Sequence, residues 1–173
     1  MIFLDFEASA GMGGYPIEVG FCVVEPDRTM RSAAKLIRYD EWLDDLPRWD
    51  WRAQEIHHID REHLMEFGES PVSVMRWLNT ELTGMVACCD SYMDKLWLKE
   101  LADTAGIVPA FGLEDIAVAF DGPEIDEMGY QWALTVKDRV CPKTHRADRD
   151  SEHLATWYVL SLKLGAPVRQ VQL

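Results

Sequence analysis

The chain has 173 residues, of which 48% are hydrophobic and 27% are charged. This composition is typical of a globular protein that buries a full core, and we expect one domain over residues 1–173. The formal net charge of −13 argues against sequence-independent binding of long duplex DNA, which depends on Lys and Arg. No apolar run comes near the roughly 18 residues of a membrane span. The four cysteines form no Cys-x-x-Cys pair, and the first residues do not resemble a signal peptide, so we expect free thiols and a cytoplasmic protein.

Residues 1–7 (Met-Ile-Phe-Leu-Asp-Phe-Glu) predict a short buried strand, followed by a loop of small residues at 8–14. Side chains alternate across a strand, so Asp5 and Glu7 point to the same face, about 7 Å apart. Two carboxylates on one face of a buried strand repel each other and lose hydration unless a cation lies between them. The alternative is that both acids reach solvent at the end of the strand.

Two further strands are expected at residues 17–25 and 29–39, and their short connections favour an antiparallel meander with the first strand. Glu18 is either a polar neighbour of the first two acids or a solvated edge residue, and we favour the neighbour. The loop at 8–14 lacks the Lys-Ser/Thr of a phosphate loop, which argues against a Walker nucleotide site.

Residues 40–59 are rich in Trp and irregular, and we expect them to end in a short helical piece that carries His57 and His58. Adjacent histidines point in different directions on any regular element, so they make a poor metal pair. A structural or surface role is the alternative for each of them. Helices are expected at residues 60–67 and 71–82.

A buried strand is expected at residues 85–89, followed directly by a helix. Asp90 occupies the position of an N-cap, and capping would explain it fully. Asp94 differs, because apolar residues follow it at helical spacing: Trp97, Leu98 and Leu101. Asp94 therefore lies on the inward face of the helix, where an acid without a partner is costly.

Residues 111–116 predict a last strand, and residues 124–136 predict a helix. The final helix is expected over residues 148–164, with Asp148 suited to a cap and Gly165 ending it. Strands that cluster early and then alternate with helices favour an α/β or α+β mixed sheet.

Asp150 lies in the first turn of the final helix, on its apolar stripe. That stripe consists of Leu154, Trp157, Tyr158 and Ser161. His145 lies five residues before Asp150, in the loop that leads into the helix. The surrounding segment 137–149 also holds the basic residues Lys137, Arg139, Lys143, Arg146 and Arg149. This is a local concentration of positive charge beside the candidate chemistry.

Four inward acids stand out: Asp5, Glu7, Asp94 and Asp150. Carboxylates in this number suit Mg²⁺ or Mn²⁺, which prefer oxygen ligands. Two such ions about 4 Å apart can clamp the attacking and leaving oxygens of a phosphoryl transfer. Histidine is the side chain that ordinarily titrates near neutrality, which makes it the natural base for the attacking water, and His145 is the candidate.

These residues resemble the DEDDh family of 3′–5′ exonucleases, which includes ribonuclease T, oligoribonuclease and the proofreading subunit of DNA polymerase III. Segments 2–7 and 15–20 are similar to the first motif of the family. Asp94-Lys-Leu-Trp-Leu98 is similar to the second, and His145-Arg-Ala-Asp-Arg-Asp150 to the third. Segment 55–59 (Glu-Ile-His-His-Ile) resembles the Ile-His-Gly-Ile segment between the first two motifs. The motifs follow the order of the family and span nearly the whole chain.

The resemblance implies a ribonuclease H-like α/β fold, with a five-stranded mixed sheet flanked by helices. It implies release of nucleoside 5′-monophosphates from a 3′ end. Asp5 would bridge two metal ions, Mg²⁺ or Mn²⁺. Glu7, Asp94 and Asp150 would complete their ligand shells, and His145 would be the general base.

The resemblance also implies a pocket for the terminal 3′-OH, built partly by backbone near Phe6, Ala8 and Ser9, with His57 beside it. The chain departs from the family at two places. Ala8-Ser9-Ala10 stands where Thr-Thr-Gly is common, which removes one hydroxyl contact. Cys89-Asp90-Ser91 replaces His-Asn-Ala, which adds an acid and leaves both Asp90 and Asp94 open as the ligand, with Asp94 preferred.

Our leading hypothesis is a metal-dependent 3′–5′ exonuclease that acts on single-stranded or short RNA, with DNA as the alternative. Stacking on aromatic residues would hold such a strand with little positive charge, and Tyr15, Trp42 and His57 are candidates. One alternative is a non-catalytic nucleic-acid or protein-binding module of the same fold. Another is a phosphoesterase that acts on dinucleotides or nucleotides. A homodimer is expected by analogy with relatives only.

Overall fold

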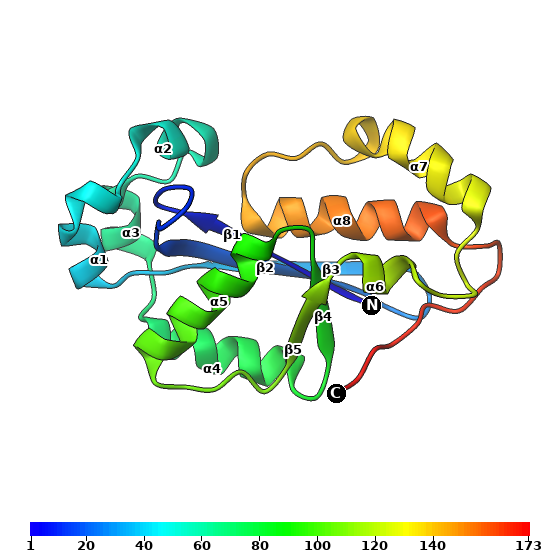
Figure 1. Ribbon diagram of the computed structural model, residues 1–173, viewed down its shortest axis with the longest axis horizontal. Coiled ribbons are helices and arrows are strands. Elements are labelled where there is room, and N and C mark those ends of the chain that lie inside the picture. Colours follow the sequence, from blue (N-terminus) through cyan, green and yellow to red (C-terminus); the bar gives the residue numbers. More distant parts are fainter.

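Five segments pair into one mixed sheet (Figure 1). The computed structural model of the chain describes residues 1–42, 44, 45 and 47–173 in full, and residues 43 and 46 by their backbone. The strands are β1 (Ile2–Ala8), β2 (Pro16–Val24), β3 (Met30–Leu36), β4 (Val86–Cys89) and β5 (Gly112–Asp115). Their order is β3-β2-β1-β4-β5, with β1, β2 and β3 antiparallel and with β4 and β5 parallel to β1. The expected five-stranded mixed sheet is therefore confirmed.

The helices fall close to the predicted positions, and two short ones were not predicted separately. The first half of the chain has α1 (Asp40–Asp44), a 3₁₀ turn η1 (Leu46–Arg48), α2 (Trp51–His57), α3 (Arg61–Phe67) and α4 (Pro71–Leu82). The second half has α5 (Tyr92–Ala105), α6 (Ala117–Phe120), α7 (Glu127–Val140) and α8 (Ala147–Ser161). Within the described residues, no helix combines the length and the hydropathy that crossing a membrane requires.

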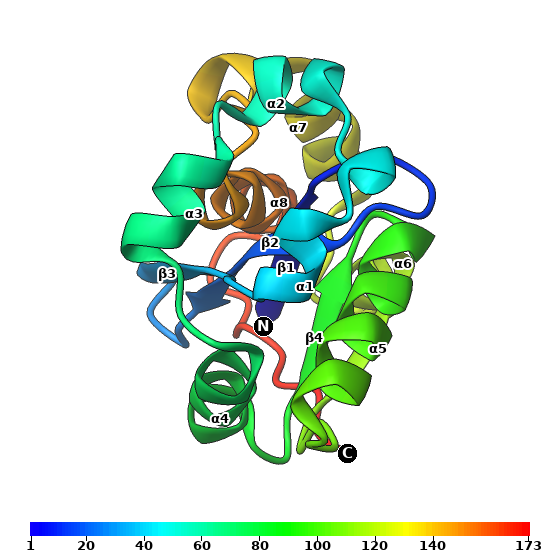
Figure 2. The same cartoon turned by 90° about the vertical axis from the view of Figure 1, so that its left-hand side faces the viewer.

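The two faces of the sheet carry different helices (Figures 1 and 2). On one face, Ile2, Leu4 and Phe6 of β1 pack in a core with α4 and α5. On the other face, Met1 and Phe3 pack in a core with α8. Because side chains alternate along β1, Asp5 and Glu7 share the face of Met1 and Phe3. The alternation therefore directs both acids towards α8.

The first turn of α5 begins differently from the prediction. Ser91, rather than Asp90, is the N-cap of α5, and its hydroxyl accepts the N–H of Met93 at 3.1 Å. Asp90 instead accepts a hydrogen bond from Lys143 Nζ at 2.8 Å. The prediction of an Asp90 cap was wrong because a partner 53 residues away competes for the carboxylate.

The last two helices also have shifted ends. Helix α7 starts after its N-cap Asp126 and runs to Val140, later than the predicted 124–136. Helix α8 follows Arg146 and ends at Ser161, four residues before Gly165. Asp148 lies inside the first turn rather than at the cap, and the N–H of Ala147 donates to Glu18 of β2 at 2.9 Å. A strand residue thus takes over the capping function that the sequence suggested for Asp148.

Gly20 of β2 lies directly beneath the first turn of α8, where a Cβ would overlap the backbone of Ala147 and Asp148. We expect Gly20→Ala to lower the free energy of unfolding by about 1–3 kcal/mol, because neither backbone can yield without moving α8 off the sheet. Urea unfolding curves measure this change. Gly11→Ala is the matched control, since a Cβ there meets nothing within 4 Å, and we expect a change within about 0.5 kcal/mol. Equal stability of the two variants would contradict this packing.

Candidate active site

Asp5 and Glu7 lie at the carboxyl end of β1, the strand in the middle of the sheet. Asp5 is buried, with 8% of its surface exposed, and Glu7 is half-buried. Opposite Glu7, in register across the β1–β2 ladder, stands a third acid, Glu18. The end of β1 therefore gathers acids that are largely removed from water.

Asp94 reaches the same place from the first turn of α5. It is 1% exposed, and carboxylate oxygens of Asp5, Asp90 and Asp94 all lie within 4.8 Å of one another. Among the described side chains and backbone groups, none donates a hydrogen bond to Asp94 Oδ2. A buried carboxylate oxygen without a donor is costly, and this oxygen faces other acids. Asp90 is more exposed and is paired with Lys143, so the structure favours Asp94 over Asp90 as a free ligand.

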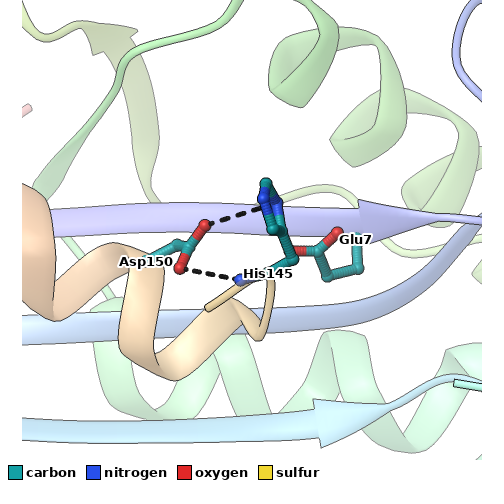
Figure 3. Close-up of side chains that lie close together, drawn as sticks. All are labelled: Glu7, His145 and Asp150. Atoms are coloured by element: carbon teal, nitrogen blue, oxygen red, sulfur yellow. Dashed lines mark hydrogen bonds and ion pairs between the residues drawn. The ribbon is translucent and has the colours of Figure 1, made fainter. Parts of the chain in front are cut away.

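Asp150 and His145 complete the cluster from the start of α8 (Figure 3). Asp150 Oδ1 accepts the backbone N–H groups of Thr144 at 2.8 Å and His145 at 3.2 Å, while Oδ2 lies 4.0 Å from His145 Nδ1. These bonds hold His145 in a left-handed backbone conformation, with φ of 55°. Atoms of Glu7, His145 and Asp150 lie within 4.8 Å of one another, and the His145 side chain is 51% exposed. An exposed ring beside buried carboxylates is well placed to exchange protons with bound water.

Glu18 supports this arrangement as a neighbour of the first acids. It is 1% exposed and accepts hydrogen bonds from Arg146 Nη2 at 2.6 Å, from Arg146 Nε at 3.1 Å and from the N–H of Ala147 at 2.9 Å. The pair joins β2 to the loop that carries His145. One signal in the sequence points to this partner: a buried acid on a strand requires a cation, and basic residues cluster at 137–149.

Burial and mutual repulsion raise the pKa values of the clustered acids. Burial raises the pKa of Asp5 well above its usual range, with further repulsion from Asp94, Glu7 and Asp150. Burial and the charge of Asp150 raise the pKa of Glu7 to about 8. Burial and the charge of Asp90 raise the pKa of Asp94 to about 7. The folded chain thus disfavours the ionised form of all three acids unless positive charge is supplied.

The donor set fits a hard divalent cation. Asp5, Glu7, Asp94 and Asp150 offer only carboxylate oxygens, which suits Mg²⁺ or Mn²⁺ better than softer metals. The unpartnered Oδ2 of Asp94 supplies an independent reason, since a cation would satisfy it. The residues therefore fit the metal chemistry that the sequence predicted.

A pocket of about 210 Å³ opens beside the cluster. Its lining includes Phe6, Ala8, Ala10, His57, Trp97 and His145. Three of the expected substrate-binding residues, Phe6, Ala8 and His57, thus line one pocket with the candidate base. Trp97 was predicted to be an inward core residue. Its place in the second motif, three residues after Asp94, was the signal that could have placed it in this pocket.

Ser9 lies apart from this lining. Its hydroxyl donates to the carbonyl of Arg48 at 2.8 Å and accepts the N–H of Tyr15 at 2.9 Å. It is 2% exposed, so these bonds fasten the β1–β2 loop to η1. The side chain of Ser9 therefore has a structural role.

His57 is buried at the end of α2. Its Nδ1 accepts the N–H of Ile59 at 3.0 Å, and burial lowers its pKa to about 4, so the ring is neutral at pH 7. His58 adopts a left-handed conformation, with φ of 57°, at the position where the related segment has Gly. His57 is therefore the last residue of α2, and His58 is its C-cap.

Tyr15 and Trp42 pack on each other. Their rings stack with centroids 5.0 Å apart, and Trp42 is 6% exposed. The Tyr15 hydroxyl donates to Asp45 at 2.8 Å. Trp42 is buried and cannot stack on a nucleic-acid base, whereas Tyr15 is half-buried, with Trp42 and Arg48 packed against its ring.

Comparison with solved structures identifies the fold. No family model and no curated protein sequence matches the chain. A full-length 3′-exonuclease has a TM-score of 0.65 at 14% identity, over 98% of this chain and 84% of that one. Exonuclease I of E. coli in complex with a dA16 oligonucleotide also has a TM-score of 0.65, at 10% identity over 94% of this chain. Its zinc-bound form with single-stranded DNA has a TM-score of 0.63 at 11% identity over 93%.

The chain therefore has the fold of these exonucleases, an α/β fold with a ribonuclease H-like mixed sheet. The chain spans about two fifths of the exonuclease I chains, 41% and 39%. At identities of 10–14%, the likeness concerns the fold. The case for activity therefore depends on the carboxylate cluster.

We expect Asp94→Asn to raise the free energy of unfolding of the metal-free protein at pH 8. The pKa of Asp94 is raised from 3.8 to about 7, so the wild-type fold loses stability as the pH rises through this range. An amide carries no charge and avoids this loss, which corresponds to roughly 2–4 kcal/mol. Urea unfolding in EDTA at pH 8 and at pH 4 measures the difference, which should vanish at pH 4.

Asp103→Asn is the matched control, because Asp103 lies on the same helix with 65% of its side chain exposed. We expect it to change stability by no more than about 0.5 kcal/mol. A loss of stability in Asp94→Asn at pH 8 would show that Asp94 is a satisfied structural residue.

Proposed function

We propose that residues 1–173 form one exonuclease domain, which hydrolyses single-stranded or short RNA from the 3′ end in a divalent-metal-dependent reaction. Short DNA is the alternative substrate. The observation that carries the proposal is the buried, unpartnered Oδ2 of Asp94 within a cluster of acids beside His145. The exonuclease fold, seen in structures that hold single-stranded oligonucleotides, supports it.

The carboxylates of Asp5, Glu7, Asp94 and Asp150 would hold two cations, Mg²⁺ or Mn²⁺. When bound, the cations would supply positive charge to the phosphate and lower the pKa of a bound water. The pocket lined by Phe6, Ala8 and His57 would receive the terminal nucleoside and place its phosphate beside the cluster. Binding of a terminal nucleoside in this pocket would direct the reaction to a chain end.

His145 would accept the proton of the attacking water. Its ring is half exposed, and Asp150 Oδ2 lies 4.0 Å from Nδ1, near enough to orient and stabilise the protonated ring. A bond would form between the water oxygen and phosphorus as the bond from phosphorus to the 3′ oxygen of the preceding nucleotide breaks, and that oxygen would take up a proton from solvent water. The products are a nucleoside 5′-monophosphate and a chain with a new 3′-OH.

We expect the purified protein to shorten 5′-labelled oligonucleotides one nucleotide at a time in Mg²⁺ or Mn²⁺. Asp5→Asn should abolish the reaction, and His145→Ala should slow it by roughly 10²–10⁴-fold, the usual contribution of a general base. Gel ladders on RNA and DNA in parallel measure the rates and the preferred sugar. Asp103→Asn should retain full activity.

Internal cleavage products, or undiminished activity in Asp5→Asn, would contradict the proposal. No cleavage of any substrate would favour the binding module. The small pocket and the acidic chain keep a dinucleotide phosphoesterase as a second candidate. Rapid cleavage of dinucleotides with no shortening of a ten-nucleotide strand would favour that enzyme.

We also expect Mn²⁺ to raise the melting temperature of the wild-type protein at pH 8, reversibly on addition of EDTA. A ligand present at one hundred times its Kd stabilises the folded state by about 2.7 kcal/mol. Asp5→Asn should lose most of this response, because Asp5 lies between the other acids. Differential scanning fluorimetry measures the shift, and an equal shift in Asp5→Asn would place the cation elsewhere.

Two further expectations remain proposals. A cytoplasmic location fits the four cysteines, which are all free thiols. A homodimer would follow the analogy with relatives, and sedimentation or size-exclusion measurements decide it.

A further inference from the structure

The ion pair of Asp90 and Lys143 stands beside the carboxylate cluster, and the proposed reaction leaves it without a role. Lys143 lies in the loop between α7 and α8, two residues before His145. Its Nζ donates to Asp90 Oδ2 at 2.8 Å, and the side chains are 37% and 30% exposed. The pair therefore links the end of β4 to the loop of the candidate base, partly shielded from water.

This pair is electrostatically coupled to the cluster. Oxygens of Asp90, Asp5 and Asp94 lie within 4.8 Å of one another, so Asp90 is an additional carboxylate of the same group. The charge of Lys143 acts on the carboxyls of Asp5, Glu7 and Asp94, and it lowers the pKa of each. Lys143 thus offsets part of the free-energy cost of burying these acids close to one another.

The charges of these carboxylates and of Lys143 can be compared with the charge of two divalent cations. Asp5, Asp90 and Asp94 form one set of mutually close ligand atoms, and Glu7 and Asp150 form a second set with His145. Together with the ammonium of Lys143, these five carboxylates carry four net negative charges, which is the charge that two divalent cations neutralise. Loss of Lys143 alone would leave an excess negative charge and free Asp90 to turn towards the cations. Loss of Asp90 alone would leave an unpaired ammonium beside them.

We propose that Asp90 and Lys143 are a built-in counter-charge pair, through which the chain sets the affinity of the carboxylate cluster for divalent cations. Lys143 is a positioning residue in this view, since it acts by holding Asp90 out of the metal site. The inference rests on the proposed function, because it assumes that the cluster binds cations.

A purely mechanical role would leave a different signature. If the pair only fastened the loop of His145, loss of either partner would disturb the cluster in the same direction. A counter-charge role demands opposite effects from the two single substitutions, and near-cancellation when both are made. The sign of each effect therefore distinguishes the two roles.

The experiment is a calorimetric titration of the purified protein with Mn²⁺ at fixed pH and ionic strength. Because both side chains are partly exposed and solvent screens their charges, we expect Lys143→Met to tighten binding on the order of ten-fold and Asp90→Asn to weaken it similarly. The double variant should bind within about three-fold of the wild type. Lys95→Met is the matched control, since Lys95 pairs with Glu114 at 3.3 Å and its side chain, at 33%, is about as exposed as that of Lys143. The Mn²⁺ affinity of this variant should equal that of the wild type.

Urea unfolding curves establish that each variant folds. If a single variant does not fold, the double variant, in which neither residue is charged, is measured in its place. The inference would be overturned if the wild type binds Mn²⁺ but both single variants bind it with the same affinity as the wild type, or both bind it more weakly. Either result would leave the proposed function intact. Absence of Mn²⁺ binding by the wild type would overturn the proposed function, and the counter-charge role with it.

Discussion

Repulsion among Asp5, Glu7 and Asp94, in a place that water scarcely reaches, is the constraint on which the rest of the site depends. Each acid alone could be tolerated at the end of a strand or in the first turn of a helix. Burial is the largest cause of their raised pKa values, and the charges of neighbouring acids raise these values further. Such an arrangement lowers the stability of the metal-free chain at neutral pH, so it requires a rigid scaffold. Three elements provide that scaffold: the central strand β1, the start of α5 and the start of α8.

The start of α8 is held in place by two features of β2. Glu18 accepts the guanidinium of Arg146 and the first free N–H of the helix, where an anion is favoured by the helix dipole. Two residues along, Gly20 allows the backbone of α8 to approach the sheet more closely than any side chain would permit. Asp150 and His145 lie on either side of this anchor in the chain. Their position beside Glu7 therefore follows from a strand that carries none of the candidate catalytic groups.

Local patterns predicted much of this site, and distant partners account for the remainder. Alternation along β1 was sufficient to place Asp5 and Glu7 on one face, and helical spacing was sufficient to turn Asp94 and Asp150 inward. The prediction of Asp90 as a cap failed because a local rule cannot foresee Lys143, which lies 53 residues later. The prediction for Trp42 failed for a similar reason, since its burial against Tyr15 of the β1–β2 loop has no signature in either segment. For Glu18, the sequence could predict that a buried acid needs a basic partner, but it could not predict that this partner is Arg146.

The positive charge near the site is mostly engaged within the chain. Of the basic residues in segment 137–149, Lys137 pairs with Asp138, Lys143 with Asp90, Arg146 with Glu18 and Arg149 with Glu152. On a chain of net charge −13, these pairs leave little basic surface along which a long phosphate backbone would bind. Under the proposed function, affinity must therefore come from the terminal pocket and from cations held by the carboxylates. Both act on the last nucleotides of a strand, so the electrostatics and the geometry of the pocket favour short substrates with a free 3′ end.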